Sequence, residues 1–238
     1  TNPDAMNYEE DAVFDDGSCV VPDIIVPDDE STIQNALSNA TAGQTIFVRA
    51  GTYYESNIIW PNIYGLKLIG ESKNNTIIDA NSSGRIFHYY SGCTATIDGS
   101  TLISNFTLQN GFINGSGSCM HFHMGVPSLD NLIIKDNVSS WGNRGAINFY
   151  GNAYQSGNAI FSDVYFINNY GYSGAAITVT TSGCAGTGDA NGDLYIVNSI
   201  FEDGYGHYGT GLYLSDADKI FNNIIIDKCY FVNNIAES

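Results

Sequence analysis

The sequence predicts an all-β solenoid, a right-handed parallel β-helix with an α-helix capping its N-terminal end. The first observation is a recurring unit, in which an apolar strand ends in an Asn, a Gly- and aromatic-rich loop follows, and a second strand opens. The strand-ending residues are Asn110, Asn137, Asn169, Gly204 and Asn234, at steps of 27, 32, 35 and 30. Repeats of this length predict a solenoid or a propeller, but a propeller blade needs about four strands in ~40–45 residues. The copies in this chain, at 27 to 35 residues, are too short for a propeller blade.

The second observation is that apolar residues form columns when the copies are aligned on the strand-ending residue. Residues two apart on a strand share a face, so the positions three and five places earlier are expected to point inward. The nearer column holds Thr107, Ile134, Phe166, Phe201 and Phe231, and the farther one holds Asn105, Leu132, Val164, Ser199 and Cys229. The column between them, Phe106, Ile133, Tyr165, Ile200 and Tyr230, is expected to face outward.

Two further inward columns follow the loop. They hold Met120, Ile147, Ile177 and Leu212, and then Phe122, Phe149, Val179 and Leu214. Stacked copies would bury these columns as one continuous core. An Asn suits the strand-ending turn because it tolerates the left-handed backbone region and its side-chain amide can bond to neighbouring backbone.

A helix is predicted before the first rung, over about residues 31–41. Ser31 is the expected N-cap and Gln34 completes a capping box, while Gly43 ends the segment. The apolar stripe consists of Ile33, Ala36, Leu37 and Ala40. Such a helix would lie across the open end of the core, where the edge strand would otherwise expose unpaired backbone groups.

The chain divides into an acidic segment that ends in a cysteine, residues 1–22, and the β-helix, residues 23–238. The last copy stops at its ladder residue, Asn234, without its second strand. We therefore expect either a longer protein or a neighbouring molecule that covers this end. The five cysteines include no CxxC pair, which excludes a zinc ribbon. Cys229 is interpreted as a small core filler, and Cys93 and Cys184 are candidates for disulfides.

The net charge of the chain excludes some classes of binding partner. Eight Lys and Arg residues against 25 Asp and Glu give a net charge of -17. Nucleic acids and anionic membranes need a basic footprint, so we exclude them, and a polyanion such as pectate is disfavoured. The sequence contains no run of 18 apolar residues, so it predicts no membrane-spanning helix. We expect a secreted or cell-surface protein.

Two stretches resemble known proteins. The stretch STIQNAL…AGQTIFVRAGTYYE…LKLIGES…TIIDA, within residues 26–80, resembles the opening of right-handed β-helices of the pectin-lyase-like superfamily. This resemblance implies the fold and not an activity, since that fold carries lyases, hydrolases, esterases, adhesins and phage proteins. Residues 1–19, TNPDAMNYEEDAVFDDGSC, resemble an acidic module of bacterial surface proteins.

Three histidines are candidate catalytic residues. His88 and His121 are 33 residues apart, about one rung, and His121 and His123 flank the inward Phe122. All three are therefore expected to face outward as neighbours, where imidazoles can bind zinc or exchange protons. The alternative, which we favour, is an exposed polar face. The motifs of the superfamily's polygalacturonases are missing apart from a partial echo at Gly206-His207-Tyr208.

Aromatic loop residues and a short acidic loop are candidate ligand sites. Stacked loops would align the rings along one edge, where aromatic faces bind sugars, although some rings could instead pack as satellite core. The rings are Phe112, Trp141, Tyr170, Tyr172, Tyr205 and Tyr208. Asp189, Asn191 and Asp193 resemble part of a calcium loop, but the sixth position is Leu194 instead of Gly. A polar turn is the favoured interpretation, so no cofactor is required and Ca²⁺ is the only candidate.

The first hypothesis for function is a non-catalytic extracellular or cell-surface module of a larger protein or fibre. It would serve adhesion, glycan binding or filament assembly, with a glycan or surface polymer and other copies of the chain, stacked end to end, as partners. The alternative is a carbohydrate-active enzyme, a polysaccharide lyase or glycoside hydrolase that uses the three histidines or the loop carboxylates.

Overall fold

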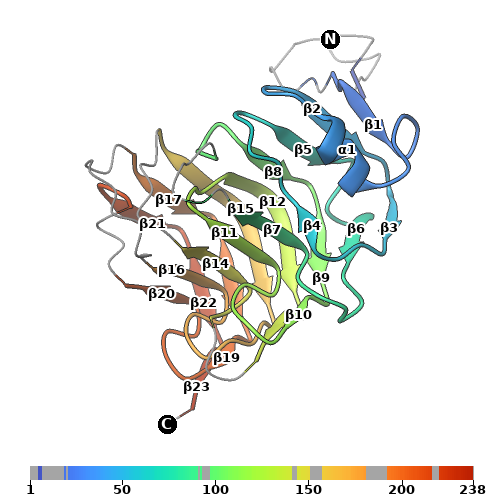
Figure 1. The fold of residues 1–238 in the computed structure, drawn as a ribbon. Helices are drawn as coiled ribbons and strands as arrows, with labels where there is room; N and C mark the ends of the chain where they lie inside the picture. The colour runs from blue at the N-terminus through green and yellow to red at the C-terminus, as the bar shows by residue number, and fades with distance from the viewer. Residues whose placement is uncertain are drawn as a thin grey trace, which may run out of the picture.

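The chain winds as the predicted right-handed parallel β-helix (Figure 1). The computed structural model describes residues 5–6, 19, 21–90, 92, 97–140, 144–150, 157–180, 192–215 and 220–237. Most of the acidic segment 1–22 lies outside the described residues, as do Cys93 and Cys184, so their predicted roles stay predictions. In the part of the chain that the structure describes, no helix has the length and apolarity needed to cross a membrane.

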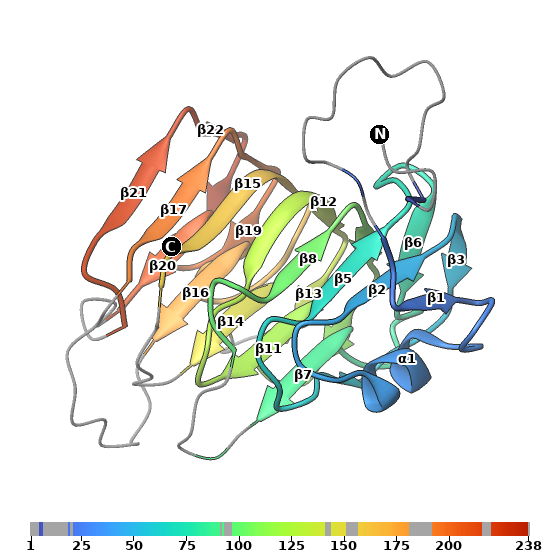
Figure 2. The ribbon, with the colours of Figure 1, turned by 90° about the horizontal axis from the view of Figure 1, so that it is seen from above.

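The largest sheet forms one wall of the coil, and neighbouring strands in it are parallel (Figure 2). Its main path contains β1 (Ile24–Val26), β2 (Thr45–Val48), β5 (Lys67–Gly70), β8 (Leu102–Ser104), β12 (Ser128–Lys135), β15 (Ala159–Ile167), β17 (Leu194–Val197) and β21 (Ile224–Asp227). Beside this path run β3 (Gly51–Tyr53), β6 (Thr76–Asp79), β9 (Thr107–Gln109), β18 (Ile200–Glu202) and β22 (Tyr230–Val232).

A second parallel sheet forms another wall and carries the three candidate histidines. In spatial order it contains β20 (Leu212–Leu214), β16 (Ile177–Thr180), β14 (Ile147–Tyr150), β11 (Met120–His123), β7 (Phe87–Tyr90) and β4 (Ile58–Ile59). Short strand pairs line the loop edge: β10 (Phe112–Ile113) with β13 (Val138–Ser139), and β19 (Tyr205–Gly206) with β23 (Ile235–Ala236).

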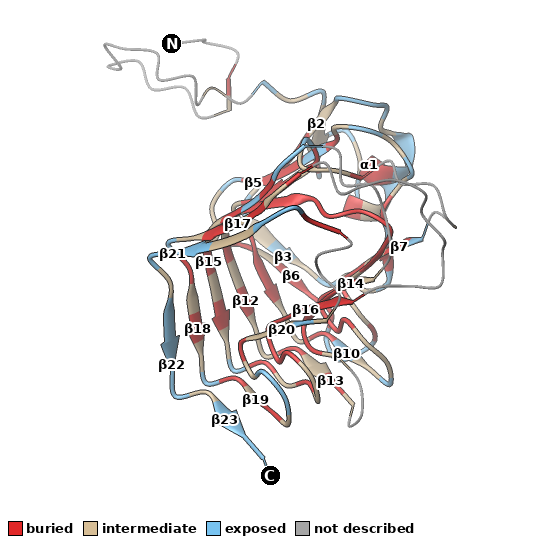
Figure 3. Cartoon of the chain, turned by 90° about the vertical axis from the view of Figure 1, so that its left-hand side faces the viewer, coloured by how far each residue is buried: buried red, intermediate tan, exposed pale blue. Residues whose placement is uncertain are grey.

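The predicted inward columns form the core, except in the end strand β20, where Leu214 is 39% exposed. In the second sheet, Met120, Ile147 and Ile177 are fully buried and occupy equivalent positions on neighbouring rungs. In the first sheet, the rings of Phe166 and Phe201 stack at 4.9 Å, and those of Phe201 and Phe231 at 4.6 Å. Equivalent residues of neighbouring rungs therefore stack on one another. This confirms the solenoid and excludes the blades of a propeller (Figure 3).

The predicted register of the first copy is wrong by one residue. Leu108, not Thr107, pairs with the inward Ile134, and Phe106, which was expected to face outward, is fully buried. Asn110 therefore precedes the ladder position, which Gly111 occupies. The alignment failed because Asn fits either of two adjacent positions in this turn, and a slip of one residue exchanges the two faces of a strand.

The structure assigns the two uses of Asn to different residues. The left-handed conformation belongs to the residue before the ladder position, namely Asn110, Asp136, Asn168, Asp203 and Asn233, with φ between 51° and 57°. The ladder residue supplies the side-chain bonds instead. The Asn169 side chain accepts from the Asn137 backbone N–H at 3.1 Å and donates to the Ile134 carbonyl at 2.8 Å. Asn137 likewise accepts from the N–H of Gly111 at 2.8 Å.

The N-terminal end is capped as predicted, although the helix is shorter. Helix α1 spans Ile33–Asn39, and its N-cap is Thr32, not Ser31, with Thr32 Oγ1 accepting from the Asn35 N–H. Gln34 does not complete a capping box. Its side chain instead accepts from the N–H of Ile59 and donates to the carbonyl of the same residue. It thereby pairs the edge of β4, the end strand of its sheet, as another strand would.

The last described rung, at the opposite end, carries exposed apolar side chains. Phe231 is half-exposed although it stacks on the core, and β22 and β23 carry the exposed side chains of Tyr230, Val232 and Ile235 (Figure 3). At the N-terminal end of the coil, by contrast, a helix and a glutamine side chain cover the edge. Direct strand pairing from head to tail would have to displace that cap.

Candidate functional site

The outward side chains of the second sheet form a surface that we call the histidine face: His88 and Tyr90 from β7, His121 and His123 from β11, Asn148 and Tyr150 from β14, and Thr178 and Thr180 from β16. His88 lies opposite His121 in the parallel register, as the sequence predicts, and their ring centroids are 5.7 Å apart. Asn148 and Tyr150 occupy the equivalent positions one rung further on. Alternation along the strands directs the residues between them into the core.

His121 is held in its neutral form. Its Nδ1 lies 2.9 Å from the Asn148 side-chain amide nitrogen, which can only donate. Burial, followed by the positive charge of Arg85 and of other neighbouring cationic groups, lowers the pKa of His121 to about 3. An imidazole with such a pKa is neutral at pH 7 and is a weak base. Burial also lowers the pKa of His88, and the charge of Arg85 lowers it further.

His123 points outward, as predicted, but it is only 7% exposed. Its ring lies between two tyrosines of the flanking rungs, 4.7 Å from the centroid of Tyr90 and 5.4 Å from that of Tyr150. One polar contact is with the backbone of Gly92, while Nδ1 is buried and has no partner among the described residues. Burial lowers the pKa of His123. The favoured expectation of an exposed polar face is therefore incorrect at this residue.

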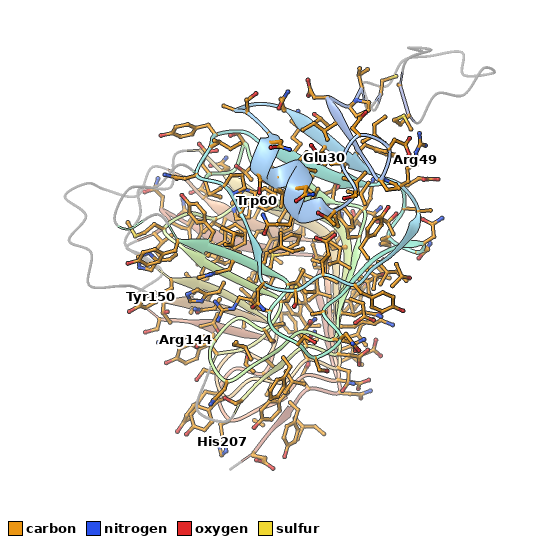
Figure 4. All side chains as sticks on the ribbon, turned by 45° about the vertical axis from the view of Figure 1, so that its right-hand side comes forward. Glu30, Arg49, Trp60, Arg144, Tyr150 and His207 are labelled. Carbon is orange, nitrogen blue, oxygen red and sulfur yellow. The ribbon has the colours of Figure 1, made fainter. Side chains whose placement is uncertain are left out.

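Two of the three arginines lie beside this face. Arg85 donates from Nη2 to the carbonyl of Ser116 at 3.3 Å, and its pKa is lowered by burial. The guanidinium of Arg144 lies 5.8 Å from the ring centroid of Tyr150 (Figure 4). Sequence reasoning missed Asn148 and Tyr150, although the signal was present. Each stands 27 residues after a candidate histidine, the same step that separates Met120 from Ile147.

The predicted aromatic edge exists at the loops of the last described rungs. Tyr170 and Tyr205 stack one rung apart with centroids 5.6 Å apart and ring planes 24° from parallel. Tyr172 lies 4.6 Å from His207 and 5.4 Å from Tyr208, measured between ring centroids. The His207 ring, which was not among the rings predicted from the sequence, also belongs to this edge (Figure 4).

The edge is partly open to solvent. Tyr208 is 56% exposed, and the other three tyrosines are half-buried. Phe112 also has an exposed ring, on the paired strands β10 and β13. Trp141 lies outside the described residues. The rings that stack on each other cover part of one another's faces, so Tyr208 and Phe112 present the most accessible surface.

The candidate calcium loop is described only at Asp193. Its carboxylate accepts from the Tyr195 hydroxyl at 3.2 Å and from the Asn223 amide at 2.9 Å. Asp189 and Asn191 lie outside the described residues. Within the described ranges, no three His, Cys, Asp or Glu side chains are grouped so that they could hold a metal ion. The three histidines are therefore not arranged as zinc ligands.

Comparison with known proteins gives distant structural neighbours. No family model and no curated protein sequence matches the chain. Among solved structures, the chain is similar to pectin methylesterase PemA from Erwinia chrysanthemi, with 12% identity, a TM-score of 0.46, and coverage of 77% of this chain and 67% of that one. A pectin methylesterase in complex with hexasaccharide VII gives 14% identity, a TM-score of 0.40 and the same coverage. At these values the likeness carries no argument about activity, and the fold follows from the strand register itself.

Proposed function

We propose that this protein is a non-catalytic, extracellular or cell-surface β-helix module that binds glycans. The observation that supports it best is the aromatic edge, where rings recur on successive rungs and one of them, Tyr208, is mostly exposed. Aromatic rings with a polar tip bind sugars because they offer an apolar face beside hydrogen-bonding groups. Stacked rungs hold the rings rigidly, so little conformational entropy is lost on binding.

The state of the histidines supports a non-catalytic role. General acid–base catalysis works best when the pKa of the group lies near the operating pH. The pKa of His121 lies near 3, and burial lowers the pKa values of His88 and His123. In the part of the chain that the structure describes, no Asp or Glu forms a hydrogen bond or ion pair with these three imidazoles.

Composition supports the extracellular assignment. A net charge of -17 with eight basic residues favours neither a nucleic acid nor an anionic membrane as partner. The acidic segment resembles modules of bacterial surface proteins, which is consistent with attachment to a larger assembly. End-to-end assembly is the less supported form of this proposal, because α1 and Gln34 cover the N-terminal edge.

The alternative is a polysaccharide lyase or glycoside hydrolase that acts at the histidine face. The feature in its favour is the pair of arginines beside three imidazoles, since cationic groups stabilise developing negative charge. The alternative predicts turnover, and the binding module predicts retention of the glycan without turnover.

A glycan array run beside a turnover assay separates the two. The wild-type protein should retain at least one class of glycan and should release neither reducing ends nor unsaturated products. Tyr208→Ala should weaken that binding by about tenfold, the loss of ~1.4 kcal/mol of aromatic contact. The matched control is Tyr54→Ala, because Tyr54 is 73% exposed and is not part of the aromatic edge. Turnover of any polysaccharide would overturn the non-catalytic assignment, and failure to retain any glycan would overturn the proposal.

A further inference from the structure

Two Asn-Gly pairs lie four residues apart at the loop edge of the coil, and the structure gives them very different surroundings. Asn110-Gly111 follows β9, and Asn114-Gly115 follows β10. In such a pair the backbone nitrogen of the glycine can attack the side-chain amide of the asparagine, because glycine has no Cβ to obstruct the approach. The surroundings of each pair decide whether this attack can occur.

The first pair is held in place by hydrogen bonds that oppose the reaction. The amide nitrogen of Asn110 donates to both carboxylate oxygens of Asp79, at 3.0 and 2.9 Å. The attacking atom, the backbone nitrogen of Gly111, is buried and donates to Asn137 Oδ1 at 2.8 Å. Attack would break all three bonds, and the new carboxylate would stand against that of Asp79, so this pair is protected.

The second pair lacks these restraints. Asn114 is exposed, and in the part of the chain that the structure describes the Gly115 N–H has no hydrogen-bond acceptor. The side-chain oxygen of Asn114 accepts from the Ser140 hydroxyl on the neighbouring rung at 2.7 Å. A donor at this oxygen stabilises the negative charge that forms there during attack. The hydrogen bond therefore favours the reaction and leaves the attacking nitrogen free.

A cationic side chain lies beside the second pair. Arg85 donates from Nη2 to the carbonyl of Ser116 at 3.3 Å, and the same nitrogen lies 3.8 Å from the position that a Cβ on Gly115 would take. A nearby positive charge favours the anionic form of a group. The guanidinium therefore stabilises both the deprotonated nitrogen of Gly115 and the carboxylate product.

We propose that Asn114 is a site of spontaneous deamidation, selected over Asn110 by the fold and promoted by the Ser140 hydroxyl. The Gly115 nitrogen forms a bond to Cγ of Asn114, the bond from Cγ to the amide nitrogen breaks, and the proton lost by the attacking nitrogen leaves with the ammonia. Water then opens the succinimide ring at either carbonyl, which gives aspartate or isoaspartate. No electrons are transferred, and the loop gains one negative charge beside Arg85.

Incubation of the whole chain in mildly alkaline buffer, followed by peptide mapping in a mass spectrometer, tests the proposal. Chymotryptic cleavage after Phe112 separates the two asparagines, and electron-transfer fragmentation distinguishes isoaspartate from aspartate. In the folded protein Asn114 should convert at least about tenfold faster than Asn110, because attack at Asn110 must first break hydrogen bonds. In concentrated urea the fold constrains neither pair, so the two rates should become similar.

Two substitutions of Ser140 test its role. Ser140→Ala should slow conversion of Asn114 in the folded protein by about threefold or more, whereas Ser140→Thr keeps the hydroxyl and should convert like the wild type. In urea both variants should match the wild type. If the hydroxyl only anchored the loop, Ser140→Ala would free the side chain and speed the reaction.

Three results would each overturn the proposal. They are conversion of Asn110 as fast as Asn114 in the folded protein, no conversion of Asn114 there while the chain in urea converts, and a rate for Ser140→Ala equal to or above that of the wild type. The deamidation proposal is independent of glycan binding, so none of these results bears on the proposed function.

Discussion

Replacing Asn169 by alanine tests whether the asparagine ladder holds neighbouring rungs together. Asn169 is buried, and its side chain pairs the backbone N–H of Asn137 and the backbone carbonyl of Ile134. Asn169→Ala leaves both groups buried and unpaired. At about 1–3 kcal/mol for each group, the loss should be about 2–6 kcal/mol, a large share of the ~5–15 kcal/mol that a domain possesses.

The last described rung offers a matched control. Asn234 makes the same two bonds, accepting from the Gly204 N–H at 2.8 Å and donating to the Phe201 carbonyl at 2.8 Å. It is only half-buried, so water can replace its side chain, and Asn234→Ala should cost about 1 kcal/mol.

Urea unfolding, followed by tyrosine and tryptophan fluorescence, measures the loss in free energy of unfolding for each of the two variants. Because solenoids can unfold by parts, hydrogen exchange of the Asn137 amide should accompany it, and that amide should lose protection in the Asn169→Ala variant. If the two variants differ by less than about 0.5 kcal/mol, the ladder contributes no more in the core than at the surface, and the reasoning is wrong.

Three further predictions concern packing and charge. Phe201→Ala should cost about 3–5 kcal/mol because its ring lies between two others, whereas the half-exposed Phe231→Ala should cost roughly half as much; similar urea midpoints would contradict this. Gly171→Ala would place a Cβ 2.3 Å from the Gly145 Cα and should cost about 3 kcal/mol. In Gly43→Ala the new Cβ meets no atom within 4 Å, so this variant carries only the strain of a positive φ, about 1 kcal/mol. Equal losses of stability in the two variants would refute the close approach of Gly171 to Gly145. Because the folded pKa of His121 is about 3 against an ordinary 6.5, the unfolded chain takes up the proton first as the pH falls. The wild type should therefore lose up to ~4 kcal/mol more than His121→Gln between pH 6.5 and 3, and parallel plots of the urea midpoint against pH would contradict the neutral assignment.

Periodicity made the fold predictable. Apolar residues recurred at fixed offsets from an Asn, and only stacking of the copies can bury such columns, which is why the core positions of β11, β14 and β16 were correct. The pairing of His88 with His121 followed from the same register. These inferences needed no knowledge of side-chain contacts, because parallel strands in a coil repeat their inward and outward positions from rung to rung.

The same reasoning failed where two adjacent positions accept the same residue. Asn110 looked like a ladder residue, but Asn is also favoured in the left-handed position before it, and the sequence carries no signal that separates the two. The helix start shifted for a comparable reason, since Ser31 and Thr32 both suit an N-cap. Gln34 then bonds to β4 because tertiary packing places that edge within its reach.

What the sequence determined by itself is the coil, its capped end and the residues that share a rung, since these depend on spacing along the chain. Only the tertiary structure decided the chemical state of the outward residues. Burial of His123 between Tyr90 and Tyr150, and the bond from Asn148 that keeps His121 neutral, depend on side chains from three separate rungs. Solvent exposure and hydrogen bonding are properties of that three-dimensional arrangement, so the spacing of residues along the chain could not reveal that these histidines are buried and that His121 is neutral.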